Sequence, residues 1–306
     1  MTPEQYLAHL MPPTAAVDAI LDTDTYNELD DQFALAYMLR SSDRIRVRAL
    51  TAAPFFNSNS TSPEDGMERS YDEIHKILKL AERTDLADLV YRGSRTYLPD
   101  ENTPVMSDAA HAICRIAAEY TAEKPLYIVA IGAITNVASA FLMDPSIADR
   151  TVVVWLGGHA LHWQDTKEFN MVQDIAAARV VFHSGAPLVQ LPCMGVVSEF
   201  RVSGPELEYW LAGKNPVANY LARNTVDQVE KHLGGQAWTR VIWDATAVGF
   251  LLNEGGRFMR AELRPLRLPA YDGTYEVEEQ DRLFCYVAEI YRDALMTDMM
   301  HKLAKG

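Results

Sequence analysis

Short apolar runs alternate with amphipathic segments of helix length from the N-terminal region to about residue 200. Strands are expected at 16–21, 47–52, 126–131, 152–156 and 187–191, with a short one near Val90. Helices are expected at 30–40, 66–83, 108–120 and 174–183, with another from Thr135. This order predicts an α/β fold with a mostly parallel central sheet, helices on both faces and an open, Rossmann-like core.

The remaining third of the chain is more helical. A helix is expected at 243–252, several short strand-like runs at 258–287, and a final helix that ends near Lys302. No internal repeat and no Pro/Ser-rich linker interrupts the pattern. We therefore expect one domain that spans residues 1–306.

Charge and cysteine content narrow the class of protein. The 306 residues carry a formal net charge of -14, which argues against binding to nucleic acid or to an anionic membrane surface. Cys114, Cys193 and Cys285 lie far apart, so neither a disulfide framework nor a zinc ribbon is expected. The N-terminal segment lacks the pattern of a signal peptide, and no run of apolar residues is long enough for a membrane span. These features predict a cytoplasmic protein.

Carboxylates cluster directly after the first expected strand. That strand ends at Asp22 and Asp24, and Glu28 precedes Asp30 and Asp31 at the start of the next helix. Ligands of open α/β sheets bind outside the carboxyl ends of the strands. A cation would relieve the repulsion, and a donor set of oxygens alone favours Ca²⁺ or Mg²⁺ over zinc. The alternative is a simple helix cap, but the size of the cluster favours a functional site.

Two further motifs follow later expected elements. Glu168, Phe169 and Asn170 come after the strand at 152–156, and their acceptor and donor groups suit a ligand with several hydroxyls. Trp243 and Asp244 stand at the start of a late helix. Taken singly, the first motif is an ordinary helix start, Asp244 a cap and Trp243 a core residue.

In this order, the motifs resemble the nucleoside hydrolase family of the inosine–uridine preferring type. The resemblance extends from about residue 16 to the C-terminus and covers the DTD…DD pattern at 22–31, a Thr-Asn pair at 135–136, a Gly-Gly turn at 157–158, the EFN motif at 168–170 and the late Asp244. It implies a nucleoside hydrolase-like fold. The implied activity is calcium-dependent hydrolysis of the N-glycosidic bond of ribonucleosides, which gives ribose and free base.

The resemblance also implies a role for each matching residue. The metal ligands would be the side chains of Asp24, Asp31 and Asp244 and the main-chain carbonyl of Ile131. Asp24 would in addition be the general base for the attacking water, with Asp22 supporting the metal-binding residues. The residues implied to contact the substrate are Asp30, Asn57, Leu156, Glu168 and Asn170.

This chain departs from the family pattern at three places. Five residues, 25–29, separate Asp24 from the next aspartate pair, two more than usual. Trp243 occupies the place of a histidine that commonly protonates the leaving base, and a Trp-Asp pair there resembles the purine-specific branch. Stacking on Trp243 would then activate the base, purine nucleosides would be favoured, and the role would be purine salvage. The segment 107–111 matches poorly, which leaves open whether His111 reaches the site.

Two alternatives remain at this stage. A haloacid-dehalogenase-type phosphotransferase would explain Asp22 and Asp24, but it gives no reason for Glu168 or Asp244. That family also has Thr or Val at the position that Tyr26 occupies in this chain. A non-catalytic nucleoside- or ribose-binding protein on the same fold would fit the longer loop and the missing histidine. The resemblance also implies a homo-oligomer, a dimer or a tetramer, with a small-molecule nucleoside as the substrate.

Overall fold

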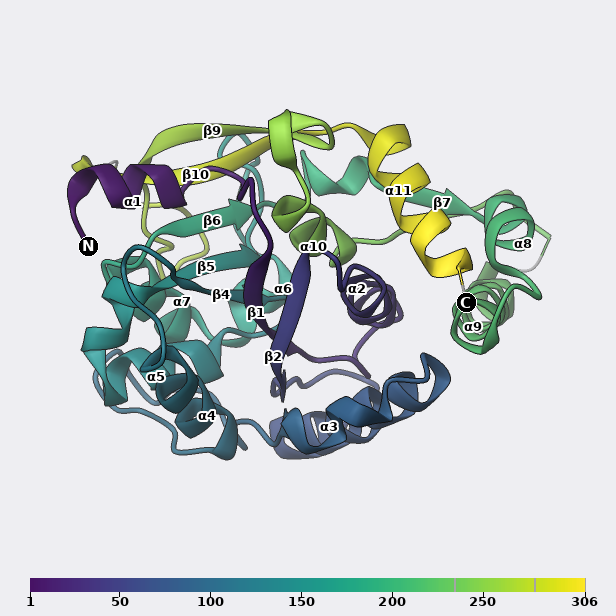
Figure 1. Ribbon diagram of the computed structural model, residues 1–306, viewed down its shortest axis with the longest axis horizontal. Helices are drawn as coiled ribbons and strands as arrows, with labels where there is room; N and C mark the ends of the chain where they lie inside the picture. The colour runs from purple at the N-terminus through teal and green to yellow at the C-terminus, as the bar shows by residue number, and fades with distance from the viewer. Residues whose placement is uncertain (234, 278, 306) are drawn as a thin grey trace.

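A computed structural model describes residues 1–233, 235–277 and 279–305, with the side chains of residues 232, 279 and 280 outside the description. Its central sheet has eight strands in the order β3-β2-β1-β4-β5-β6-β10-β9 (Figure 1). These strands are β1 (Val17–Thr23), β2 (Ile45–Ala52), β3 (Val90–Tyr91), β4 (Leu126–Ala130), β5 (Thr151–Leu156), β6 (Leu188–Leu191), β9 (Met259–Leu266) and β10 (Glu279–Ile290).

The sheet is parallel except at one edge. Strands β1 to β6 pair in parallel, β10 pairs in parallel with β6, and β9 closes that edge as an antiparallel partner of β10. Every residue of β4 and β5 is buried, as expected for strands covered on both faces. The predicted fold class, a mostly parallel sheet with helices around it, is therefore confirmed.

Helices cover both faces of the sheet (Figure 1). One face carries α4 (Asp108–Ala117), α5 (Thr135–Met143) and α7 (Ile175–His183); the other carries α2 (Asp30–Leu39), α3 (Pro63–Leu80), α10 (Ala245–Leu251) and α11 (Arg292–Ala304). The remaining α-helices are α1 (Pro3–His9), α6 (Phe169–Gln173), α8 (Gly204–Leu211) and α9 (Pro216–Leu233). Short 3₁₀ helices span Thr84–Leu89, Pro145–Arg150, Val197–Glu199 and Glu254–Gly256. Two clusters of buried apolar side chains, one on each side of the sheet, form the core.

A small excursion leaves the sheet after β6. It contains β7 (Arg201–Ser203), α8, α9 and β8 (Thr239–Val241), and β7 pairs antiparallel with β8 (Figure 1). Because β8 lies directly before Trp243 and Asp244, the placement of this excursion sets the placement of those two residues.

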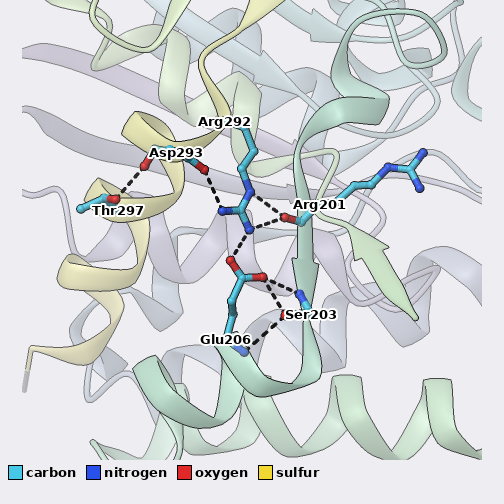
Figure 2. A network of polar contacts seen from close by, with 6 residues as sticks. All are labelled: Arg201, Ser203, Glu206, Arg292, Asp293 and Thr297. Atoms are coloured by element: carbon cyan, nitrogen blue, oxygen red, sulfur yellow. Dashed lines mark hydrogen bonds and ion pairs between the residues drawn. The ribbon is translucent and has the colours of Figure 1, made fainter. Parts of the chain in front are cut away.

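A polar network holds the excursion to the C-terminal helix (Figure 2). The guanidinium of Arg292, at the start of α11, donates to the carbonyl of Arg201 at 2.7 and 2.9 Å and binds the carboxylates of Glu206 and Asp293. The other oxygen of Glu206 accepts from the backbone N–H and the hydroxyl of Ser203, which caps α8. One arginine thus joins β7, α8 and α11.

Several predicted boundaries differ from the structure. The helix expected at 66–83 begins earlier, at Pro63. It ends at Leu80, because Glu82 adopts a positive φ of 58°, which is outside the α-helical region. The expected helix at 108–120 ends at Ala117. The short strand-like runs at 258–287 are the two long strands β9 and β10, joined by a segment that includes residue 278, which lies outside the described residues. Helix α1 and the β7–β8 pair were not predicted.

Within the part of the chain that the structure describes, no helix combines the length and the apolar character that crossing a membrane requires.

Candidate active site

A cavity of about 260 Å³ opens at the carboxyl ends of the parallel strands. Asp24 follows β1, Ile131 follows β4 and Leu156 ends β5, and all three line this cavity. The chain turns from β1 to β2 on one side and β4 lies on the other, so the cavity sits where the strand order reverses. Open α/β sheets bind their ligands at this position.

Four buried aspartates form one end of the cavity, which we call the acid end: Asp24, Asp30, Asp31 and Asp244. Each is at most 4% exposed. Among the residues that the structure describes, Asp30, Asp31 and Asp244 bring ligand oxygens within 4.8 Å of one another. Both carboxylate oxygens of Asp24 and Oδ1 of Asp30 are buried without a hydrogen-bond partner.

The side chains of Asp30, Asp31 and Asp244 make no helix-cap bond. Leu29 is the N-cap of α2 and makes no side-chain cap bond, while Asp30 and Asp31 lie in the first turn. Asp244 is the N-cap of α10, yet its side chain makes no cap bond either. The carboxylates therefore point into the cavity without meeting the backbone donors that a cap would satisfy.

Burial and mutual repulsion raise the pKa values at the acid end. Burial, followed by the charge of Asp30, raises the pKa of Asp31 to about 8. Burial first and neighbouring aspartates second raise the pKa values of Asp24 and Asp244 well above the usual range. Ionising all four groups together is costly unless a positive charge joins them.

Neighbouring polar side chains fix the carboxylates in place. The hydroxyl of Thr23 donates to Oδ1 of Asp31 at 2.5 Å. Asp22 lies one layer deeper, where its Oδ1 accepts from Thr51 at 2.6 Å and from Asn136 at 2.8 Å. Asn136 belongs to the Thr-Asn pair of the sequence motif, so that motif positions Asp22 and lies outside the cavity lining.

Glu168 and Asn170 form one wall beside the acid end. Oε1 of Glu168 accepts from the backbone N–H of Asn170, and Oε2 accepts from those of Gly158 and Met171, at 2.8–3.0 Å. Glu168 is thus a true cap of α6 as well as a cavity residue. The amide of Asn170 donates to the carbonyls of Ile131 at 3.2 Å and Leu156 at 3.0 Å, which commits its NH₂ group and leaves its Oδ1 as an acceptor.

Another part of the cavity lining is partly exposed and less acidic. We call it the rim and define it by His159, Lys167, Met194 and Trp243. Of these, the sequence motifs singled out Trp243 alone. His159 and Lys167 lie in the long loop between β5 and α6, and nothing in their spacing marked them.

An ion pair bridges the longer first loop and the excursion. The carboxylate of Glu28 binds the guanidinium of Arg240 on β8. Burial raises the pKa of Glu28 to about 7, with the charge of Asp30 acting in the same direction and Arg240 against it. Arg240 lies 212 positions from Glu28, and no sequence motif predicted this pair.

Asn57 lies outside this cavity. It lines a neighbouring one of about 360 Å³, and its amide donates to Oδ1 of Asn27 at 2.6 Å. Asn27 and Glu28 line both cavities and separate them. His111 is exposed on α4 and does not line the carboxylate cavity. The structure thus brings together the other residues named for metal and substrate: Asp24, Asp30, Asp31, Ile131, Leu156, Glu168, Asn170, Trp243 and Asp244.

A divalent cation fits the acid end. All donors there are oxygens, which suits a hard ion. The unpartnered oxygens of Asp24 and Asp30 are the kind of buried group that needs an outside partner. The carbonyl of Ile131 accepts one bond from Asn170 and retains a second lone pair.

Comparison with known proteins gives a family. A family model described as inosine-uridine preferring nucleoside hydrolase matches residues 19–289. The chain belongs to the nucleoside hydrolase family. A relative from Salmonella enteritidis PT4 (strain P125109), named pyrimidine-specific ribonucleoside hydrolase RihA, is 26% identical over 228 residues, which cover 68% of this chain and 70% of that protein.

Solved structures show the same fold as this nucleoside hydrolase. The plant nucleoside hydrolase PpNRh1 superposes with a TM-score of 0.74 at 18% identity, covering 95% of this chain and 99% of that one. A purine-preferring ribonucleoside hydrolase from Gardnerella vaginalis gives a TM-score of 0.72 at 19% identity, with 94% and 98% covered. Family membership makes the protein an N-ribohydrolase and removes the phosphotransferase alternative.

Proposed function

We propose that this protein hydrolyses ribonucleosides to ribose and free base, that it depends on Ca²⁺ and that it favours purine nucleosides. The observation that carries the proposal is the set of buried, unpartnered carboxylate oxygens of Asp24 and Asp30 beside Glu168 and Asn170. A cation would be held by Asp24, Asp31 and Asp244 and by the carbonyl of Ile131. When bound, it supplies positive charge that offsets these carboxylates and polarises the oxygens in its shell.

Different residues would hold the ribose and activate the attacking water. Glu168 and Asn170 present fixed acceptors and Asp30 a free carboxylate oxygen, so together they would hold the ribose hydroxyls. Asp24 would take a proton from the attacking water, whose oxygen bonds to C1′ while the C1′–N bond breaks. Leu156 would pack beside the ribose, and Asn57 would act through Asn27.

The purine preference rests on Trp243. Its side chain lines the rim immediately before Asp244, so a base held over the acid end would lie against the indole. An indole is not a proton donor near neutral pH, and stacking adds only about 0.5–1.5 kcal/mol. A purine offers N7 to a proton from solvent, which a pyrimidine lacks. The curated relative is named pyrimidine-specific and one structural neighbour purine-preferring, so turnover has to decide.

Trp243→Ala tests this proposal with two substrates. If Trp243 stacks on the base, the variant should lose about tenfold in kcat on inosine. The loss on p-nitrophenyl riboside should be much smaller, because that leaving group needs little activation. Equal losses would make Trp243 a packing residue, and faster turnover of uridine than of inosine would contradict the purine preference.

The proposal also covers the domain organisation, the location and the assembly of the protein. We propose that residues 1–306 act as one domain, that the protein works in the cytoplasm in purine salvage, and that it assembles as a homodimer or homotetramer. Its partner is a small nucleoside, with no role for nucleic acid or membrane. Limited proteolysis tests the single domain, and light scattering at several protein concentrations tests the assembly.

A further inference from the structure

His159 is held at four points in the loop that follows β5. Its backbone N–H donates to Oγ1 of Thr166 at 3.4 Å, and its carbonyl accepts from the hydroxyl of Tyr275 at 3.1 Å. The backbone N–H of Met194 donates to its Nδ1 at 3.3 Å, and Trp163 meets its ring edge-on with centroids 6.2 Å apart. Such a ring is pre-positioned at the rim of the cavity.

These contacts fix which ring nitrogen carries the hydrogen. A backbone N–H is only a donor, so Nδ1 of His159 must be an acceptor and the hydrogen lies on Nε2. Nε2 has no hydrogen-bond partner among the residues that the structure describes. Burial lowers the pKa of His159 from its usual value, while Asp165 acts in the opposite direction. The ring is therefore a neutral donor with its one free N–H on Nε2.

Two other donors along the cavity, Lys167 and Cys193, are less suited to this task. The side chain of Lys167 is exposed, and its methylene groups lie over Gly273. The thiol of Cys193 is buried beside the carboxylate of Glu168, and burial raises its pKa well above the usual range. His159 alone among the three combines a fixed orientation with a free N–H.

We propose that Nε2–H of His159 donates a hydrogen bond to the leaving base and stabilises the negative charge that forms on it. The inference rests on the proposed hydrolase function. As the C1′–N bond breaks, its electron pair moves into the base, the water oxygen bonds to C1′, and one water proton passes to Asp24. The base then takes a proton from solvent at the exposed rim, and Asp24 returns its own proton to solvent. A fixed neutral donor aimed at developing charge acts as an oxyanion-hole group does.

The test compares leaving groups. His159→Ala should lower kcat on inosine by about 10²–10³-fold, the usual effect of removing one such donor. Turnover of p-nitrophenyl riboside should change by less than about threefold, because the p-nitrophenolate carries its own charge well. His159→Gln, which keeps an N–H donor, should recover part of the loss on inosine, whereas His159→Phe should not.

A histidine three residues along the same loop provides the control. His162 is exposed and does not line the cavity, so His162→Ala should leave both substrates unaffected. Equal losses on the two substrates in His159→Ala, or full activity in His159→Phe, would overturn the inference. If the wild-type protein itself turns over neither substrate with Ca²⁺ present, the proposed function fails, and that outcome differs from a failure of His159 alone.

Discussion

At the acid end of the cavity, three of the four aspartates come from the end of a sheet strand or from the first turn of the next helix, and Asp244 follows the excursion; at the rim, every side chain comes from a loop or from the excursion. Asp24 follows β1, and Asp30 and Asp31 open α2, so the main sheet itself sets their positions. Trp243 follows β8 of the excursion, and His159 lies in the loop after β5. In the proposed function, the sheet thus positions most of the residues that would handle sugar and water, and loop segments position those that would meet the base.

Among changes at the acid end, Asp31→Asn should have the largest effect on cation binding and turnover. Without this charge the cation should bind much more weakly, and turnover should fall to background. In the metal-free protein the same change should raise the melting temperature, because it removes one of several buried like charges. Calorimetric titration with Ca²⁺ and a thermal melt in chelator measure the two effects.

A carboxylate elsewhere in the fold serves as the control for that change. Asp108 lies in the first turn of α4, exposed and away from the cavity. Asp108→Asn should leave Ca²⁺ binding and turnover unchanged. Wild-type affinity for Ca²⁺ in Asp31→Asn would contradict the placement of the metal.

A change of substrate tests the recognition of ribose by Asp30, Glu168 and Asn170 without any mutation. A site whose buried acceptors expect a hydroxyl leaves one of them unpaired when 2′-deoxyinosine binds. We expect kcat/KM to fall by about 10⁴-fold relative to inosine. Comparable rates on the two nucleosides would show that Asp30, Glu168 and Asn170 do not recognise the 2′-hydroxyl of the ribose.

Arg240→Gln breaks the ion pair between the first loop and the excursion. Loss of this cation leaves Glu28 facing Asp30 without compensation. We expect KM to rise about tenfold with a smaller fall in kcat, and the free energy of unfolding to drop by about 1 kcal/mol. Steady-state kinetics and urea unfolding give these values.

Two further variants separate the ion pair from general charge effects. Glu28→Gln in the Arg240→Gln background should restore much of the stability, since the repulsive carboxylate is then gone. Arg260→Gln removes a surface cation on β9 that binds Glu289, and it should affect neither KM nor kcat. A double variant no better than Arg240→Gln would show that the pair is not coupled.

The pKa shifts also predict a pH dependence of stability in the metal-free protein. The folded-state pKa values of Asp22 and Asp31 are raised by burial to about 6 and 8, so the native state binds more protons than the unfolded state between about pH 4 and 8. Stability in chelator should therefore fall as the pH rises through that window. Thermal melts at pH 5 and pH 8 measure it, and saturating Ca²⁺ should reduce the slope. A melting temperature that rises with pH in chelator would contradict these shifts.

The contrast between the acid end and the rim also explains which features the sequence could predict. Three residues of the acid end, Asp24, Asp30 and Asp31, were predictable because they lie close together in the chain and follow an apolar strand, whereas Asp244 was expected only from the resemblance to the family. The parallel sheet was predictable for a similar reason, since each buried strand has a local apolar signature.

The rim and the ion pair between Glu28 and Arg240 depend on contacts between distant segments. Arg240 meets Glu28 across 212 positions, and Nδ1 of His159 is fixed by Met194, which follows another strand. The strands β7 and β8 have three residues each, too few for a pattern. No local signal marks such residues, so only the folded chain reveals them.

The two edges of the sheet bear on how copies of this chain could assemble. One edge is β3, which is two residues long, and the other is β9, which carries Pro265 and the charged side chains of Arg260, Glu262 and Arg264. Short, charged or proline-containing edges resist pairing with a strand from another molecule. Copies of the chain should therefore meet through helices and loops, and the protein should stay free of sheet-extended fibres at high concentration.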